Sequence, residues 1–302
     1  MGAAPGWTGD SVNLPETVIE WRGLTIYGTS GPGRITFRTL EGWEGVEGRQ
    51  RLLERPSSDG AFDGPVYGQP KTVRVAGRVG SPALRDTILA ELGAAFALQN
   101  RERRASPLRI THAGRALSSS ARLLRYVPAA TAWGSGWFDW AAEWSCADPL
   151  RYGDPTSTQT PFPTLRGGLE YDLYTDGTVD TGFLEYGEAS DTGRIVIENP
   201  GTADSWPVFQ VDGPVDAAGF DIAVVGTDKR VRFVGPVSEG SALVIDSAAG
   251  TAVIDGTADR GGQLSGRDWF PVPAGGSVEL AFIPLGSNLG AELTVVTRPA
   301  WW

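Results

Sequence analysis

The balance of charge along the chain changes sign near residue 152, and this break constrains the fold more than any other feature. Residues 1–152 carry 18 Lys and Arg against 15 Asp and Glu, and residues 153–302 carry 8 against 21, giving net charges of +3 and −13. Between the halves, the stretch 153–163 is rich in proline, which neither propagates a helix nor holds a central strand. The sequence therefore predicts two domains, residues 1–152 and 167–302, joined by a linker over residues 153–166.

Composition is typical of globular proteins. Of 302 residues, 41% are hydrophobic and 21% charged, and the 41 glycines and 21 prolines follow no period, which fits many turns between short strands. No signal peptide is visible, no apolar run reaches the roughly 20 residues that span a bilayer, and a sequence pI of about 4.7 disfavours nucleic-acid binding. We expect a protein made in a cytoplasm, with no membrane insertion and no recognition of nucleic acid sequence.

The first half mixes strands with one helix, which predicts an α+β domain of antiparallel strands. The helix is expected over Pro82–Leu98, with Ser81 as its N-cap and an apolar stripe along one face. Residues 44–64 are rich in Gly, Glu, Arg and Asp and are expected to form a long loop or an extended arm. The expected strands are Val18–Trp21, Leu24–Tyr27, Ile35–Leu40, Lys71–Val79 and Trp137–Trp144, together with another hairpin in which Pro107–Thr111 and Ser118–Val127 flank a turn around Ala113-Gly114-Arg115.

The second half contains no helical pattern but many short strand candidates separated by turn residues. Such regular spacing predicts a β-sandwich of jelly-roll type, so the whole chain is expected to be mainly β. The expected strands are Gly193–Glu198, Val208–Val211, Phe220–Val225, Arg230–Val234, Ala242–Asp246, Thr251–Ile254, Ser277–Ile283 and Glu292–Thr297.

His112 and Cys146 are the only residues of their types, which limits the catalytic and metal chemistry available. His112 lies at an expected hairpin turn, and no Gly-x-Ser-x-Gly motif surrounds any serine, so no catalytic triad is predicted. Cys146 forms no intrachain disulfide, and its apolar strand pattern predicts a buried, unreactive thiol. Metal sites built on His or Cys are excluded, and no phosphate loop or dinucleotide motif suggests a cofactor.

Carboxylates leave two weaker possibilities. Asp246, Asp255 and Asp259 offer oxygen ligands for calcium, but their spacing does not match the helix–loop–helix pattern, and turn aspartates explain them. The acidic residues between positions 170 and 176 offer the carboxylate pair of a glycosidase, but a solvated acidic face explains them better. We therefore predict that the chain is not an enzyme, and we leave bound calcium open.

Tryptophans supply the remaining binding candidates. Trp269 stands between two expected strands, where an exposed ring would stack on a sugar, although core packing is the commoner use of such a ring. Trp301 and Trp302 follow the second half, and we expect them to dock on that half or on a neighbouring subunit, because adjacent tryptophans are seldom left in water.

Several short motifs occur in an order that resembles a known family. They are the N-terminal hairpin, Asp63-Gly64-Pro65 with Tyr67, the helix Pro82–Leu98, Asp148-Pro149-Leu150-Arg151-Tyr152, Ser205-Trp206-Pro207 and the run from Trp269 to Gly275. In this order and over nearly the whole chain, they resemble the distal tail protein (Dit) of long-tailed, non-contractile bacteriophages. The motifs Asp148–Tyr152 and Trp269–Gly275 carry most of the resemblance.

The resemblance implies a structural role at the tail tip of a virion, after assembly in the host cytoplasm. Members of this family form a hexameric ring through the N-terminal domain, and the ring joins the tail tube to the tail-associated hub protein. Their C-terminal domain is a galectin-like sandwich. The tape-measure protein and a host-surface glycan are further candidate partners. The family has no catalytic residues to carry over, and here the second domain is too short to contain an inserted module.

A ring of copies would place the arm between subunits. We expect Arg49, Arg51 and Arg55 to meet carboxylates of the next subunit. Two alternatives remain open. A carbohydrate-binding module would act as a monomer with Trp269 as its platform, and a glycan hydrolase would need a carboxylate pair in a cleft.

Overall fold

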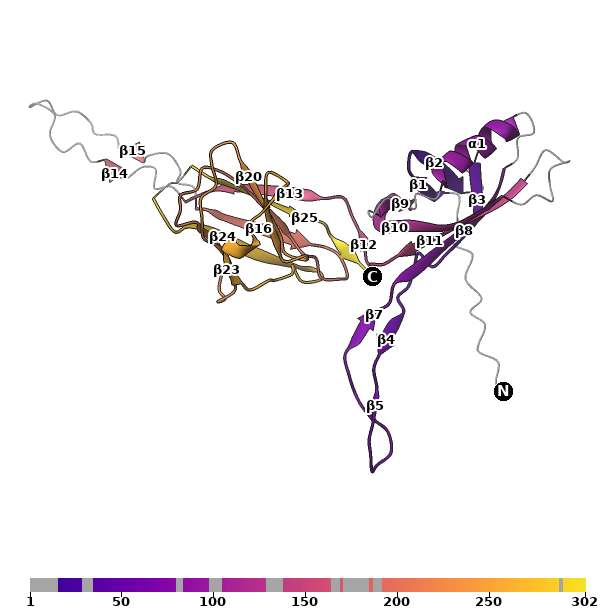
Figure 1. Cartoon of the computed structure of the whole chain (residues 1–302), viewed down its shortest axis with the longest axis horizontal. Helices are drawn as coiled ribbons and strands as arrows, with labels where there is room; N and C mark the ends of the chain where they lie inside the picture. The colour runs from indigo at the N-terminus through magenta and orange to yellow at the C-terminus, as the bar shows by residue number, and fades with distance from the viewer. Residues whose placement is uncertain are drawn as a thin grey trace, which may run out of the picture. The chain divides into compact units, whose positions relative to one another are not determined.

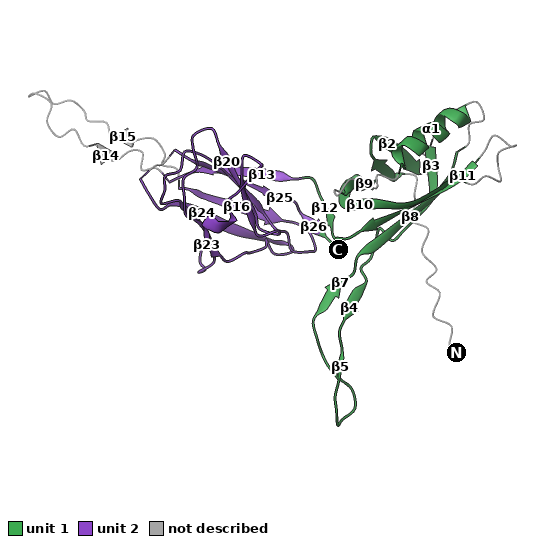
Figure 2. Cartoon of the chain, viewed as in Figure 1, with its two compact units in different colours: residues 1–154, 301–302 green, residues 155–300 purple. Residues whose placement is uncertain are grey.

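The computed structural model describes residues 16–28, 35–79, 84–97, 105–128, 138–163, 192–287 and 290–302, and the backbone of two short strands, β14 (Leu169–Glu170) and β15 (Glu185–Tyr186). The protein is mainly β, as expected, and the described residues contain one α-helix. The chain divides into two compact units (Figures 1 and 2). Unit 1 comprises Met1–Asp154 and Trp301–Trp302, and unit 2 comprises Pro155–Ala300.

Unit 1 is built on one sheet that closes on itself. Its strand order is β11-β8-β3-β2-β1-β9-β10-β12-β26, and a further pairing of β10 with β11 completes the circuit. The strands are β1 (Val18–Trp21), β2 (Leu24–Gly28), β3 (Ile35–Glu41), β8 (Lys71–Val79), β9 (Ser106–His112), β10 (Arg115–Pro128), β11 (Phe138–Cys146), β12 (Arg151–Tyr152) and β26 (Ala300–Trp301). All expected strands of this half are present, but β2 and β3 pair in parallel, which corrects the expectation of purely antiparallel pairing.

Closure depends on β10, the second strand of the expected hairpin, which is present with its turn at Ala113 and Gly114 as predicted. β10 is one strand whose first half pairs with β9 and whose second half pairs with β11. The strand continues beyond the hairpin because each half has its own partner. The register shifts between Leu123 and Arg125, and such a bulge bends a strand from one partner toward another.

Aromatic side chains fill the inside of unit 1. The Trp21 and Trp144 rings meet edge to face with centroids 5.7 Å apart. The helix α1 (Arg85–Ala95) lies beside β2, buries Ile88 and Leu92, and accepts a hydrogen bond from Trp21 Nε1 at the carbonyl oxygen of Ala95, 3.0 Å away (Figure 1). The buried Ile88 and Leu92 belong to the expected apolar stripe, but the helix is shorter than the expected Pro82–Leu98, and its N-cap position is Leu84 rather than Ser81, which lies outside the described residues.

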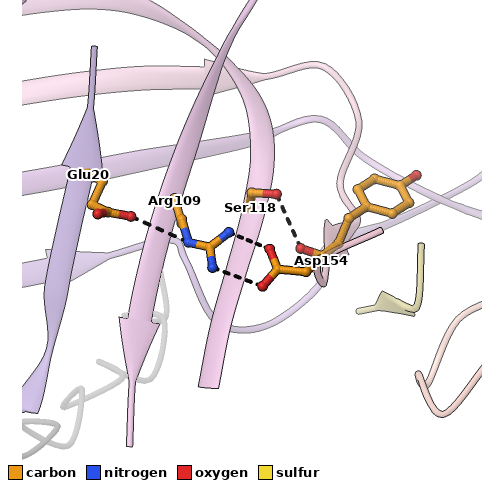
Figure 3. Close-up of polar contacts among 5 residues, drawn as sticks. Glu20, Arg109, Ser118 and Asp154 are labelled. Carbon is orange, nitrogen blue, oxygen red and sulfur yellow. Dashed lines mark hydrogen bonds and ion pairs between the residues drawn. The ribbon is translucent and has the colours of Figure 1, made fainter. Parts of the chain in front are cut away.

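Charged contacts fix the chain where it leaves unit 1. Arg109 of β9 pairs with Glu20 of β1 at 3.4 Å, and its Nη2 donates to Asp154 Oδ2 at 3.0 Å (Figure 3). On the neighbouring strand, the Ser118 hydroxyl donates to the carbonyl oxygen of Tyr152 at 3.2 Å (Figure 3). The last residues of unit 1 before Pro155 are therefore held on β9 and β10.

Unit 2 is a sandwich of two antiparallel sheets. One has the order β13-β25-β17-β20-β21-β22 and the other the order β16-β24-β18-β19-β23. The strands are β13 (Thr156–Pro161), β16 (Arg194–Asn199), β17 (Val208–Asp212), β18 (Phe220–Val224), β19 (Arg230–Phe233), β20 (Ala242–Asp246), β21 (Thr251–Ile254), β22 (Ala258–Asp259), β23 (Leu264–Arg267), β24 (Gly276–Pro284) and β25 (Glu292–Thr297).

All eight strands expected in the second half are present, and they enclose an apolar core. Within it Phe162 stacks on Phe282 with ring centroids 4.0 Å apart. The segment expected as a linker is in part a strand, because β13 pairs with β25 along its whole length. β13 lies at the edge of its sheet, where prolines are tolerated. The prediction that this proline-rich segment forms no central strand is therefore correct, although the segment does form an edge strand.

Candidate assembly interface

Residues 46–68 form an arm between β3 and β8 of unit 1 (Figure 1). At its base β4 (Gly48–Gln50) pairs with β7 (Val66–Gly68), and farther out β5 (Leu53–Glu54) pairs with β6 (Ala61–Phe62). At the tip Gly60 has a φ of 88°, which favours glycine. The sequence predicted a long loop or an extended arm for this segment, and the structure shows an extended arm in the form of a two-stranded ribbon.

The arm has no core of its own. No residue between positions 44 and 70 is buried, although the segment contains six large hydrophobic side chains. They are Val46, Leu52, Leu53, Phe62, Val66 and Tyr67, and each is between 47% and 64% exposed. Large apolar side chains left exposed on one segment are typical of an interaction site. These side chains were not predicted as contacts, because the surrounding Gly, Glu and Arg residues dominate the composition of the segment.

The three arginines proposed for subunit contacts all lie on this arm. Arg49 belongs to β4, Arg51 follows it, and the Arg55 guanidinium stacks on Phe62 at 5.4 Å from the ring centroid. Arg49 and Arg51 line a hollow of about 620 Å³ with Leu53, Phe62 and Tyr67. Within the described part of the chain, no ion pair joins these three arginines to an acidic residue. The arm therefore combines apolar and positively charged surface.

The tryptophan candidates separate into two groups. Trp269 stands in a segment between β23 and β24 of unit 2 and packs, half-buried, against the core of that unit. Trp301 packs, half-buried, against the core of unit 1, and its ring carries the Arg115 guanidinium 3.9 Å from its centroid. Trp302 also belongs to unit 1. The expectation that Trp301 and Trp302 dock on the second half of the chain was therefore wrong. It followed from their adjacency to that half in the sequence, which does not reveal that the chain returns to unit 1.

The remaining candidates have local structural roles. His112 Nδ1 shares a hydrogen bond of 2.7 Å with the Thr17 hydroxyl. Cys146 is fully buried, which confirms the expected burial, and burial raises the pKa of its thiol and so disfavours the reactive thiolate. No cluster of three metal-ligating side chains occurs among the described residues. None of the helices in the part of the chain that the structure describes has the length and apolarity needed to cross a membrane.

The aspartates considered for calcium act as turn residues. Asp246 Oδ1 accepts hydrogen bonds from the Ala248 and Ala249 amides, and Asp255 Oδ1 accepts one from the Ala242 amide. Asp259 Oδ1 accepts one from the Gly261 amide at 2.8 Å. These bonds are the usual stabilisation of turns by aspartate. The side chains of the acidic residues between positions 170 and 176 lie outside the described residues.

Comparison with known proteins gives a match in fold. No family model matches the sequence, and no curated protein matches it. The crystal structure of the Dit protein of phage SPP1, described as a paradigm of the hub adsorption apparatus in phages that infect Gram-positive bacteria, matches with a TM-score of 0.63 at 12% identity. The match covers 95% of this chain and 99% of that one. The baseplate of phage P2 in its activated conformation with Ca matches with a TM-score of 0.48 at 11% identity, over 93% of this chain and 97% of that one. The SPP1 match confirms, at the level of fold, the resemblance that the sequence motifs indicated.

Proposed function

We propose that this chain is a structural component of a phage tail, a distal tail protein whose copies form a ring at the tail tip. The observation that supports the proposal most is the full-length match in fold to the Dit protein of phage SPP1, across both units. The match includes the unit that bears the arm. In this proposal the protein has no enzymatic activity, and it connects the tail tube to the tail-associated hub protein.

The arm supplies the physical reason for assembly. A two-stranded ribbon without a core is marginally stable in water, so an arm of this kind gains order when another surface covers it. Burying one large hydrophobic side chain contributes about 1.5–3 kcal/mol. The six exposed side chains together supply a gross gain on the order of 10 kcal/mol, reduced by the cost of association. Arg49, Arg51 and Arg55 would add contacts with carboxylates of the neighbouring copy.

A ring follows when such a contact is heterologous, because an arm that binds the next copy leaves that copy's own arm free to continue. We infer six copies from the family resemblance. The residues of 153–302, with their net charge of −13, would repel one another around the ring and keep its periphery open. The tape-measure protein and a host-surface glycan remain proposed partners in the same assembly.

The test is the mass of the full chain by light scattering behind a sizing column. A hexamer of 32.0 kDa chains has a mass of about 192 kDa by the closure rule for rings. The variant with Leu53→Asp and Phe62→Asp should shift the mass toward one chain. Replacing the three arm arginines with glutamate should have the same direction of effect. The matched control is Val196→Asp, since Val196 is 53% exposed on unit 2 and Leu53 is 58% exposed on the arm.

A chain that stays at the mass of one copy at high concentration, alone and with tube and hub proteins, would refute the ring. That outcome would favour the second candidate, glycan binding by unit 2. Trp206 supports this candidate because the residue is 41% exposed, and an exposed aromatic residue can stack on a sugar. An array of host-surface glycans would then be the experiment of choice, with Trp206→Ala and Trp269→Ala as variants.

A further inference from the structure

Segments from four parts of the sequence meet where the arm joins the closed sheet of unit 1. They are residues 43–45 before the arm, residues 68–71 at its end and beyond, the motif Asp148–Tyr152, and the pair Trp301–Trp302. This meeting point is here called the arm root. A hollow of about 510 Å³ lies beside it, lined by Glu44, Gln69 and Pro149 among others.

Arg151 is the central cation of the arm root. Its side chain is only 9% exposed, which is unusual for arginine. The guanidinium donates to the Glu44 carboxylate through Nη1 and to a main-chain oxygen of Trp302 through Nη2. It also lies over the buried Trp43 ring, 5.9 Å from the centroid. One side chain thus joins the start of the arm to a residue that follows unit 2 in the sequence.

The motif around Arg151 is fixed by its own aspartate. Asp148 Oδ1 accepts a hydrogen bond of 2.9 Å from the Leu150 amide, and Asp148 Oδ2 accepts one of 2.7 Å from the Tyr152 hydroxyl. These bonds set the turn that carries Pro149 and Arg151. The motif that contributed most to the resemblance in sequence therefore has a definite structural role at the arm root.

Trp302 packs against the other strand of the arm at the same place. A Cβ atom added at Gly68, the last residue of β7, would lie 2.9 Å from the Trp302 ring and 3.0 Å from Pro149. Gly68 pairs with Gly48 of β4 in the ladder at the base of the arm. The Trp302 ring therefore covers the end of the β4–β7 ladder, and only glycine at position 68 allows this approach.

The two residues that precede Trp302 are each held by a contact of their own. Within unit 1, the Arg115 guanidinium covers Trp301. Within unit 2, the buried Asn199 side chain accepts a hydrogen bond of 3.2 Å from the Ala300 amide and donates to three carbonyl groups. Ala300, two residues before Trp302, is thus held by the fold of unit 2.

We infer that Trp302 is a positioning residue that orders the base of the arm, so that the arm takes its shape only once unit 2 has folded and returned the chain to unit 1. The partner of this device is the chain itself. If the proposed function holds, copies that are incompletely folded have a disordered arm and do not join the ring. This consequence for assembly rests on the proposed function.

The test is hydrogen exchange of the β4–β7 ladder in the full chain, at a concentration where its scattering mass is that of one copy. If no such concentration exists, the Leu53→Asp and Phe62→Asp background supplies single copies. Trp302→Ala should speed exchange of the ladder amides at least fivefold. Trp302→Phe should retain most of the protection, because it keeps an aromatic ring over Gly68. Trp206→Ala is the matched control, since Trp206 is 41% and Trp302 42% exposed.

Equal exchange of the ladder in Trp302→Ala and the parent chain would overturn the inference, as would an equal effect of Trp206→Ala. If Trp302→Ala also speeds exchange in β8 and β11, unit 1 itself has loosened, and Glu44→Gln then decides. That variant removes the ion pair with Arg151 without touching the ring, and it should speed exchange in the ladder alone. Hydrogen exchange tests the role of Trp302, and the scattering mass tests the ring, so the two can fail separately. If the chain never assembles but Trp302→Ala still speeds exchange of the ladder, the ring is refuted and the inference about Trp302 stands.

Discussion

The arm and the unit 2 sandwich both contain large hydrophobic residues, but the arm exposes them and the sandwich buries most of them. The arm exposes six large hydrophobic side chains between residues 46 and 67. The described part of unit 2 exposes only five over its much greater length, namely Val196, Trp206, Val234, Ile283 and Leu285. Arm strands are two or three residues long, whereas β24 alone has nine. Both regions are β structure, so what distinguishes them is whether the apolar side chains face a second layer.

The contrast assigns stability and assembly to different places. The sandwich buries its apolar face within the chain and needs no partner, because two sheets cover each other. The arm has one layer, so its apolar side chains add little to the free energy of unfolding of a single copy. They remain available for another surface. Substitutions of matched chemistry in the two regions test this division directly.

The largest difference is expected for phenylalanine. Phe282 is buried and stacks on Phe162, whereas Phe62 on the arm is 54% exposed. Phe282→Ala should lower the free energy of unfolding by about 3–5 kcal/mol, because it leaves a cavity in the core. Phe62→Ala should lower it by less than about 0.5 kcal/mol in a single copy. Urea unfolding of the dilute chain measures both. A loss above 1 kcal/mol for Phe62→Ala would mean that the arm belongs to the fold of the single copy.

The next difference concerns polar side chains. Asn199 is buried and satisfies carbonyl groups of Ala203, Val272 and Pro273. Asn199→Ala should cost about 2–3 kcal/mol, because buried polar groups are left without partners. On the arm, Gln50 Nε2 donates to the Gly64 carbonyl oxygen at 3.0 Å while exposed to solvent. Gln50→Ala should cost only a few tenths of a kcal/mol, because water replaces the lost bond. Thermal unfolding of the two variants measures both losses of stability. Equal losses for Asn199→Ala and Gln50→Ala would contradict the division between a buried sandwich and an exposed arm.

The same contrast explains what the sequence could predict. In unit 2 every expected strand appeared, because alternation of apolar and polar residues records a buried and an exposed face. The hairpin of β9 and β10 was predicted correctly, but the pairing of the second half of β10 with β11 was not, because no local pattern encodes a change of partner along one strand. The β13 strand was missed because an edge position tolerates the prolines that suggested a linker. The arm was anticipated as a shape, but its pairing register was not.

The candidate site was harder to predict than the fold. Arg49, Arg51 and Arg55 were assigned to the arm from composition, and their contact with another subunit remains a prediction. The bond from Arg151 to Trp302 joins residues that lie on opposite sides of unit 2 in sequence. Neither the spacing nor the composition of these residues indicates such a contact. A single sequence reveals periodicity within elements, whereas the arm root depends on contacts between distant segments.

A third prediction sharpens the boundary between the arm and the closed sheet. Lys71 Nζ lies at the arm root, 4.6 Å from the Trp43 ring centroid, and it is buried without a hydrogen-bond partner among the described residues. Burial lowers the pKa of Lys71 to about 8. In the unfolded chain the lysine keeps its proton up to a pKa of about 10.4. Between pH 8 and this value the unfolded chain therefore binds more protons than the native state, so the free energy of unfolding should rise with pH over this range.

Lys71→Met should therefore stabilise the chain at pH 7, by about 2 kcal/mol, and should remove its share of the rise between pH 8 and pH 10. Cys146, Asp148, Glu44 and Arg151 also act on this amine, and the comparison of the two chains at each pH subtracts what they share. Denaturation at a series of pH values provides the measurement. A loss of stability at pH 7 would show that the contact with Trp43 outweighs the cost of burial, and that the root is stabilised by charge.

The smallest expected effect belongs to an exposed ion pair of the closed sheet. Arg78 on β8 donates to Asp139 on the neighbouring β11 at 2.6 and 3.0 Å, and this hydrogen bonding lowers the pKa of Asp139. A carboxylate with a lowered pKa contributes stability above the unfolded value near 4, and this contribution is lost as pH falls through the native value. Because the Asp139 side chain is 50% exposed, solvent screens the pair, and Asp139→Asn should cost at most about 0.5 kcal/mol at pH 7. Asp63→Asn on the arm controls for the loss of one surface carboxylate. A loss for Asp139→Asn that approached that of Asn199→Ala would mean that the outer face of the closed sheet depends on its charges as the sandwich depends on its core.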